Sequence, residues 1–132
     1  MQYMLILISE EGDRDDATPE QIREVMGAWN DYTQSLKGAG AFVAGDGLQP
    51  SATATTVNLA SAGDHVVTDG PFAETKEQVG GYYVIECADL DEALEWAKKV
   101  PMSPGSSIEV RPVIDYSQFG AEQPAAQGSA AS

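Results

Sequence analysis

The sequence predicts an α+β fold of the ferredoxin-like kind. Two segments carry hydrophobic residues at helical spacing behind a capping residue, and strand-like segments precede, separate and follow them. The predicted order is strand, helix, strand, hairpin strands, helix, strand, which is the ferredoxin-like order with an elaborated middle. At 132 residues, 42% of them hydrophobic, the chain suits one domain that buries about two-thirds of its unfolded surface.

The first strand, residues 2–9, leads to the first helix. Thr18 can cap this helix, Pro19 suits its first position, and Gln21 can close a capping box. Gly38 ends the helix. We expect a single inward face, whose residues recur at spacings of three and four: Ile22, Val25, Met26, Trp29, Tyr32 and Leu36.

The middle of the chain predicts a short strand and then a hairpin. Residues 42–48 form a strand interrupted by two glycines, and residues 53–59, rich in Thr and Val, form another. Residues 65–68 pair back on that second strand across a turn. Asp, Gly, Pro and Phe then follow as the DGPF loop (residues 69–72), before a strand at residues 81–87.

The second helix begins at Asp89, which can cap it, with Glu92 three residues further on. Pro101 stops the helix, and residues 107–113 form the last strand. We expect five residues of the helix to face inward: Leu90, Ala93, Leu94, Ala97 and Val100.

The domain is expected to span residues 1–114, and residues 115–132 to form a low-complexity tail. The stretch "SQFGAEQPAAQGSAAS", residues 117–132, lacks hydrophobic periodicity. It is therefore expected to be disordered or loosely packed.

The net charge excludes some partners. The chain has 21 acidic and 7 basic side chains, which gives a net charge of −14. Such a field repels phosphate backbones and anionic membrane surfaces, so we expect neither nucleic acid nor membrane as a partner. A basic protein partner is compatible with it.

The chain has one cysteine, Cys87, so no internal disulfide can form, which fits a reducing compartment. The apolar run at residues 3–8 has no basic region before it and is too short for a signal peptide or a membrane span. We therefore expect a cytoplasmic protein. Cys87 itself is expected to be a small buried hydrophobic residue.

Two predicted strands are apolar on both faces, which predicts a homodimer. In the first strand one face carries Met4, Ile6 and Ile8 and the other carries Tyr3, Leu5 and Leu7; the strand after the DGPF loop repeats this with Tyr82 and Val84 against Tyr83, Ile85 and Cys87. Two helices in this topology cover one face only, so a second copy would cover the other. The alternative is that residues 40–60 fold over the open face.

Several strings resemble one family. "DGPFAETKE", followed by "GGYYVIE" and "DLDEALEWA", resembles the DGPF branch of the YCII-related family, and "GDGLQPSATATTV" and "SIEVRPV" agree with it. The resemblance runs from residue 1 to about 113. It implies a ferredoxin-like fold, a dimeric α/β barrel and a bacterial cytoplasmic origin. Members of this branch are often encoded beside, or fused to, extracytoplasmic-function sigma factors, which implies a sigma-factor-related protein as a partner.

The resemblance does not carry over a complete catalytic pair. In the wider family a His on the first helix and an Asp near a strand end are proposed as an acid–base pair. Judged from the spacing of Tyr32, Leu36 and Gly40, the position that lines up with that His holds Trp29 here. A hydrolytic or isomerising mechanism therefore does not transfer simply.

Asp69 is the leading candidate for a catalytic or ligand-binding residue, as a carboxylate at the mouth of a pocket. The alternative is a turn in which its carboxylate accepts backbone N–H groups of the DGPF loop. Trp29, Tyr32, Phe72 and Tyr82 are candidates for the apolar lining of the same pocket, and core packing is the alternative for them.

No cofactor or metal is expected. The chain has one His and one Cys and no clustered partners for them, which argues against zinc or haem. His65 lies four residues before Asp69 on an extended strand, about 13 Å away, and is expected at a solvated hairpin position.

Two functional hypotheses follow. In the first, the chain binds a small molecule, or performs acid–base chemistry on one, in a dimer-associated pocket near Asp69. In the second, it is a non-catalytic accessory protein of an extracytoplasmic-function sigma-factor system.

Overall fold

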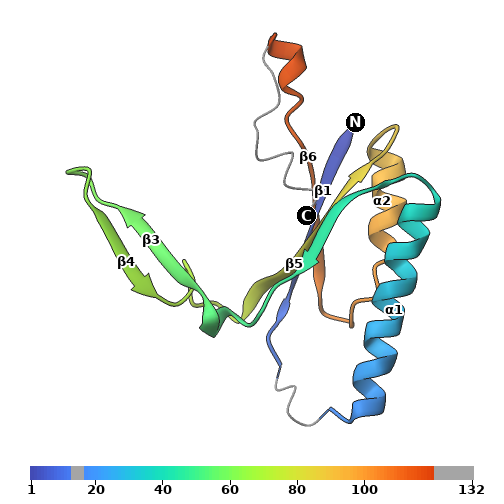
Figure 1. The fold of residues 1–132 in the computed structure, drawn as a ribbon, viewed down its shortest axis with the longest axis horizontal. Coiled ribbons are helices and arrows are strands. Elements are labelled where there is room, and N and C mark those ends of the chain that lie inside the picture. The colour runs from blue at the N-terminus through green and yellow to red at the C-terminus, as the bar shows by residue number, and fades with distance from the viewer. Residues whose placement is uncertain (13–16, 121–132) are drawn as a thin grey trace.

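A four-stranded antiparallel sheet forms the centre of the molecule. A computed structural model describes residues 1–12 and 17–120. In it the strand order is β2-β5-β1-β6. The strands span Gln2–Glu10 (β1), Phe42–Gly47 (β2), Glu77–Glu86 (β5) and Ser107–Pro112 (β6). Two helices, α1 (Pro19–Gly38) and α2 (Leu90–Lys98), lie on the same face of this sheet (Figure 1). The chain is thus a mixed α+β protein, compatible with the predicted ferredoxin-like fold.

Both helices begin as their sequences predict. The hydroxyl oxygen of Thr18 accepts a hydrogen bond from the backbone N–H of Gln21 (3.1 Å), and the Gln21 side chain accepts one from the N–H of Thr18 (2.9 Å). This is the expected capping box. At α2, Asp89 accepts from the N–H of Glu92 (2.9 Å).

The hydrophobic core lies between the sheet and the helices. Leu5, Leu36 and Ile85 are fully buried there. The register of β1 and β5 explains which of their side chains are buried. Tyr3 pairs with Ile85 and Leu5 with Tyr83, which puts every second residue of both strands under the helices. The other buried residues of this core are Tyr3, Leu7, Tyr32, Ala41, Tyr83, Cys87, Ala93, Ala97 and Val100.

At one position of the sheet a glycine is required, because the backbone of the neighbouring strand leaves no room for a side chain. Gly81 lies in β5 between β1 and β2, and a Cβ atom at this position would lie 2.9 Å from the carbonyl oxygen of Asp46. No Cβ contact in folded proteins is that short, so a side chain would have to push the strands apart. The neighbouring Gly80 has no atom within 4 Å of such a Cβ.

Within residues 1–12 and 17–120, no helix covers the second face of the sheet. Its apolar residues are Met4, Ile6, Ile8, Tyr82 and Val84, and all five are half-buried. We call them the open face. Polar groups border it: the Tyr82 hydroxyl donates to the Asp46 carboxylate (3.3 Å) on β2, and Arg111 pairs with Glu109 (2.7 Å) on β6. The expectation that both helices lie on one face of the sheet is therefore confirmed.

A second sheet has two strands only, β3 (Thr55–Leu59) and β4 (His65–Asp69), and it projects away from the body on the side opposite the helices (Figure 1). We call residues 55–69 the arm. The alternative in which residues 40–60 fold over the open face is wrong: β2 extends the sheet at its edge, and β3 belongs to the arm.

The inward faces predicted for the helices are wrong in part. Ile22, Val25 and Met26 in the first half of α1 are 46% to 65% exposed, because these turns extend past the end of the sheet (Figure 1). In α2, Leu90 and Leu94 are exposed, whereas Ala93 and Ala97 are buried. The pattern found the amphipathic face, but helical spacing carries no information on where the sheet ends.

The end of the described chain holds one short 3-10 helix, Tyr116–Phe119, within the expected tail. The expectation of disorder falls mainly on residues 121–132, which lie outside the described residues. Among the helices of the described ranges, none has the length and apolar character needed to cross a membrane.

Candidate functional site

Asp69 lies at the root of the arm, as the last residue of β4. Its backbone is fixed by its neighbours: Thr55 pairs with Asp69 in register, the N–H of Gly70 donates to the carbonyl of Ala54 (2.7 Å), and the Thr56 hydroxyl donates to the carbonyl of Gly70 (2.7 Å). Gly70 has φ +105°, a conformation that L side chains rarely adopt. The DGPF loop therefore begins with a rigid, hydrogen-bonded turn.

The side chain of Asp69 is exposed and, among the described residues, forms no hydrogen bond or ion pair. The alternative, in which the carboxylate accepts N–H groups of the loop, is not observed. The turn is held by backbone groups and by Thr56 instead. The carboxylate is thus positioned by its backbone and is free to meet something from outside the chain.

Phe72 is 90% exposed, so it is not a core plug within one chain. Exposure of a whole phenyl ring beside a rigid turn is unfavourable in water, on the order of 2 kcal/mol for a side chain of this size. The ring and the carboxylate of Asp69 lie three residues apart in the same loop. Together they offer a polar group and an apolar surface.

Tyr32 is buried in the helix-side core. Its hydroxyl donates to the carbonyl of Trp96 (2.8 Å), and its ring meets those of Tyr83 and Trp96 edge-on, with centroids 5.3 and 6.2 Å away. Burial above all, and then Tyr83 and Cys87 nearby, hold the pKa of the Tyr32 hydroxyl above its ordinary value. Tyr32 is therefore a protonated, fully engaged core residue.

Trp29 is half-buried beside it and stacks on Tyr83, with centroids 6.5 Å apart and an interplanar angle of 14°. The Tyr83 hydroxyl is 2.8 Å from the hydroxyl of Thr33. This pair of hydroxyl groups was not predicted from the sequence. Thr33 follows Tyr32 on α1, and its position one residue off the apolar stripe is the signal that could have identified it.

Tyr82 lies on the opposite side of the sheet from these rings, because successive residues of a strand alternate between faces. Its partner Asp46 was also missed, although the register of the two strands places them opposite each other. Within one chain, the sheet therefore separates Tyr82 from Trp29 and Tyr32, and Asp69 belongs to the arm, outside the four-stranded sheet.

His65 is exposed at the far end of the arm, opposite Leu59. This is the solvated hairpin position that the sequence predicts. Over residues 1–12 and 17–120, no group of three or more His, Cys, Asp or Glu side chains is arranged to hold a metal ion.

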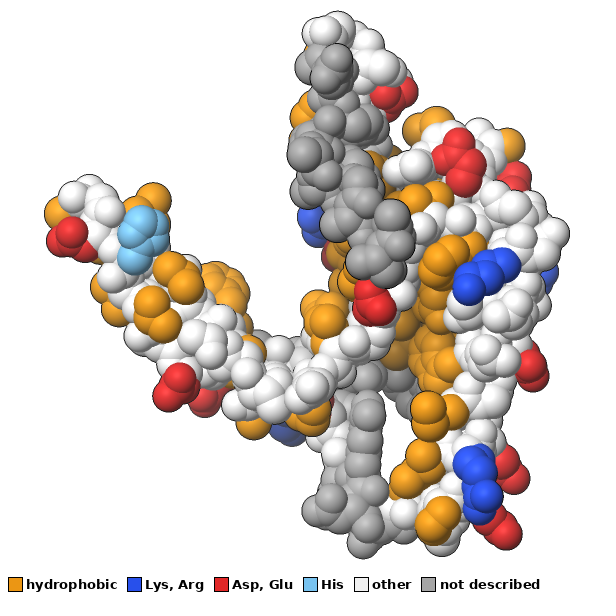
Figure 2. All heavy atoms as spheres, viewed as in Figure 1, with side chains coloured by type: hydrophobic (Ala, Val, Ile, Leu, Met, Phe, Trp, Pro, Cys, Tyr) orange, Lys and Arg blue, Asp and Glu red, His pale blue; other side chains and the backbone are white. Residues whose placement is uncertain are grey.

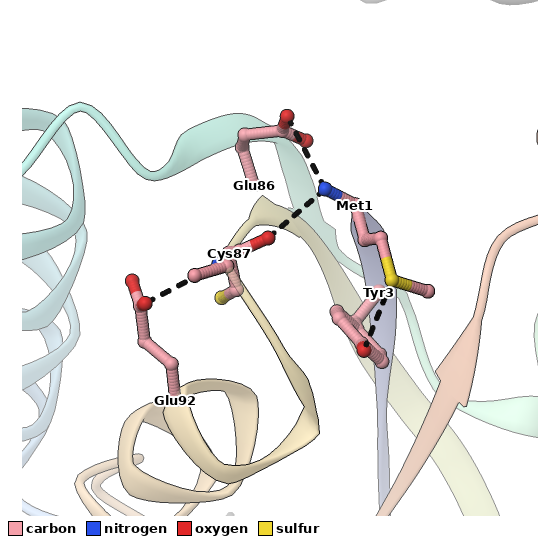
Figure 3. A network of polar contacts seen from close by, with 6 residues as sticks. Met1, Tyr3, Glu86, Cys87 and Glu92 are labelled. Carbon is pink, nitrogen blue, oxygen red and sulfur yellow. Dashed lines mark hydrogen bonds and ion pairs between the residues drawn. The ribbon is translucent and has the colours of Figure 1, made fainter.

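A network of polar contacts surrounds the start of β1 (Figure 3). The amino group of Met1 donates to the carbonyl of Cys87 (2.9 Å) and lies 3.5 Å from the carboxylate of Glu86, and the N–H of Cys87 donates back to the carbonyl of Met1 (2.9 Å). Burial raises the pKa of the Cys87 thiol, and the carboxylate of Glu92 adds to the effect. A buried, protonated thiol agrees with the structural role expected for Cys87.

A half-open cavity of about 510 Å³ lies next to this network. Its lining residues are Met1, Gln2, Glu86, Pro112, Val113, Ile114, Asp115, Gln118 and Phe119. None of the five residues predicted to form the site is among them.

Comparison with known proteins identifies a family. The model of the YCII-related domain matches residues 1–117. A protein of Rhizobium meliloti (strain 1021), described as uncharacterized, is 51% identical over 71 residues, which cover 52% of this chain and 56% of the relative. The chain thus spans about half the length of the relative it matches. On the family match, the chain belongs to the YCII-related domain family.

Proposed function

We propose that the protein is a homodimer of the DGPF branch of this family and that it binds a small organic molecule at the root of the arm, with Asp69 as the polar recognition group. The observation that carries this proposal is the rigid presentation of an exposed carboxylate without a partner among the described residues, beside a phenyl ring that is 90% exposed. Exposure to water is unfavourable for the phenyl ring, and the unpaired carboxylate is available to a hydrogen-bond donor or a cation of a ligand.

The dimer supplies the enclosure that one chain lacks. The open face has five apolar residues without a helix over them, and two sheets packed face to face would bury them in a dimeric α/β barrel. An open gap separates the arm from the body (Figure 2). A second sheet in this gap would convert the root of the arm into one wall of a cleft.

Tyr82 of the open face and Asp46 at its border are the residues that fit such a cleft. The Tyr82 hydroxyl already donates to Asp46, and both are on the side of the sheet from which the arm projects (Figure 1). Trp29 and Tyr32 act in this proposal as core residues that hold α1 on the sheet.

The chemistry of the site is recognition of a hydrogen-bond donor or a cation by a carboxylate. If the bound molecule reacts, Asp69 is the group able to accept a proton, because carboxylates act as general bases when a substrate places a C–H or O–H group against them. Trp29 occupies the position at which the wider family has its proposed histidine, so a reaction here would run without an imidazole.

A thermal-shift screen of metabolites tests the proposal. Ligands that raise the midpoint of unfolding of the wild type are expected to lose their effect on Asp69→Asn. The matched control is Asp64→Asn, an equally exposed carboxylate at the other end of the arm, on which the same ligands should keep their effect. Ligands that stabilise all three proteins equally would remove Asp69 from the site, and a broad library without a single ligand would contradict small-molecule binding.

A second candidate is an accessory protein of an extracytoplasmic-function sigma-factor system in the cytoplasm. The exposed apolar side chains of the arm and the net charge of −14 favour a partner with an apolar groove and a basic rim. In a pull-down with a purified sigma factor of this class, stable binding that Asp69→Asn leaves unchanged would favour this candidate over the first.

A further inference from the structure

We infer that the arm of one copy packs on the first half of α1 of a second copy, and that this exchange is reciprocal. The inference rests on the homodimer proposed above and adds where the arm goes. The two surfaces involved are both apolar and exposed, and neither is covered by another of the described residues of its own chain.

The arm cannot be held in place by its own two strands. A two-stranded hairpin is at best marginally stable in water, because it has one ladder of hydrogen bonds and no core. Here β3 and β4 pair over five residues, and no other strand of the described chain joins them. A hairpin with this sequence requires a surface to pack on.

Register shows which side of the arm needs that surface. Val57 is opposite Val67, and Leu59 lies two residues beyond Val57, so these three side chains share one face. The other face carries Val66 among Thr and Asn side chains. The four aliphatic residues are 49% to 69% exposed. We call Val57, Leu59 and Val67 the apolar face of the arm.

The first half of α1 has a matching stripe. Ile22, Val25 and Met26 are spaced by three and four residues, so they form one ridge, and none of them is buried. At 100° per residue Arg23 borders this ridge, whereas Glu20 and Glu24 are on the far side of the helix. The stripe is therefore an apolar ridge with a basic border.

The charges of the two surfaces are complementary. Residues 55–69 contain two carboxylates, Asp64 and Asp69, and no lysine or arginine. Asp69 lies on the same face of the arm as Val57 and Val67, at its root. Arg23 is thus a cation on the border of one surface, and the other surface has only acidic charges.

The occupant of the stripe is a second copy and not the chain's own arm. The arm leaves the body on the side of the sheet opposite α1 (Figure 1), and the sheet itself lies between them. A second copy placed on the open face brings its own helices to the side where the arm projects. Two-fold symmetry then pairs each arm with the other copy's α1, which covers both bare surfaces at once.

The length of the arm fits this placement. Facing sheets pack about 10 Å apart, and five residues of strand extend about 17 Å, so the arm extends beyond the plane of the partner's sheet toward the side of its helices.

This exchange also completes the proposed ligand site. Asp69 is at one end of the apolar face of the arm, so the second copy that covers this face closes one side of the site. A ligand at Asp69 would then contact both subunits, and a monomer would lack half of its walls.

Cross-linking between two variants that each gain one exposed cysteine tests the inference. Leu59→Cys and Met26→Cys are given different tags, refolded together and treated with a short bismaleimide. The wild type, whose one cysteine Cys87 is buried, measures the background reaction. The matched control replaces Met26→Cys by Glu24→Cys, on the far side of the same helix. The expected result is a cross-link between unlike tags with Met26→Cys, in at least about tenfold higher yield than with Glu24→Cys, because only contact raises the effective concentration of the two thiols.

Equal yields with the two helix variants would overturn the inference, as would a cross-link that forms only within a chain carrying both Leu59→Cys and Met26→Cys. Sedimentation of the same mixtures separates this failure from that of the dimer. A dimer without the selective cross-link contradicts the arm exchange alone, whereas a monomer contradicts the dimer as well.

Discussion

The two sides of the central sheet use the same kinds of side chain in opposite ways. Under the helices, Leu5, Leu36 and Ile85 are fully buried and belong to one contiguous core. On the other side, the open face is half-buried, and the arm beyond it exposes Val57, Leu59 and Val67. Hydrophobic residues on the first side stabilise the single chain most, whereas those on the second side contribute less because more of their surface stays in water.

This difference teaches that apolar content does not by itself measure core size. In β1 and β5, alternate hydrophobic side chains are buried under the helices, and those between them lie half-buried on the open face. We expect mutations on the helix side to lower folding stability and mutations on the other side to weaken association.

The largest effect is expected for Ile85→Ala on the helix side. Deleting this fully buried side chain should lower the free energy of unfolding by about 2–5 kcal/mol, from lost burial and the cavity left behind. The matched variant Val67→Ala should change it by less than about 0.5 kcal/mol in dilute protein. Urea unfolding at nanomolar concentration checks both, and comparable losses would break the distinction between the two sides.

The adjacent glycines of β5 give the next effect. Gly81→Ala should cost about 1–3 kcal/mol, because its Cβ would meet the backbone carbonyl of Asp46 at 2.9 Å and backbone cannot move aside as a side chain can. Gly80→Ala adds the same atom in open space and should change the unfolding free energy little. If thermal unfolding shows the two variants to be alike, the close approach of β2 and β5 is not as described.

Most of the fold could be predicted from local patterns. The capping box at Thr18, the cap at Asp89 and the Thr- and Val-rich hairpin all rest on interactions within a few residues, and each was found where expected. The wrong predictions concern which helix side chains are buried. The exposure of Met26 and Leu94 depends on where the sheet ends, and nothing in a helical repeat specifies that.

The candidate site was predicted less well for the same reason. Asp69 could be singled out because its loop chemistry is local, but the apolar lining was chosen by residue type alone. Tyr32 proved to be a core residue bonded to the carbonyl of Trp96, and Tyr82 is on the opposite side of the sheet. Alternation along β5 could have separated Tyr82 from Tyr83; the partner Asp46 depends on strand register, which the sequence does not specify.

Alkaline pH provides a sharper test of the helix side. Burial holds the pKa of the Tyr32 hydroxyl above its ordinary value, so above about pH 10 the unfolded chain loses this proton while the folded chain keeps it. The free energy of unfolding should therefore fall as pH rises, by at most about 1.4 kcal/mol per pH unit from this group, and be unaffected below that range.

In Tyr32→Phe this alkaline loss should shrink, at a cost near neutral pH of about 1 kcal/mol for the lost hydrogen bond to Trp96. Chemical denaturation from pH 8 to 11 measures both quantities. An identical alkaline decline in variant and wild type would show that Tyr32 is not a buried, protonated hydroxyl.

The smallest effect is expected where α1 leaves the sheet. Thr18→Ala removes the capping box and should cost about 1 kcal/mol of local helix stability. Because Ile22 and Met26 are exposed, the loss should appear as faster hydrogen exchange over the first turns of α1, with little change in global unfolding. An equal loss in global stability would mean that this half of the helix is already part of the core.

The central claim is that a second copy covers the bare side of the sheet, and sedimentation equilibrium measures this directly. At micromolar concentration the wild type should have twice the 14.0 kDa mass of one chain, and Ile6→Glu, which places a charge on the open face, should shift the mass toward one chain. A wild type that sediments as a single well-folded chain at these concentrations would contradict the account.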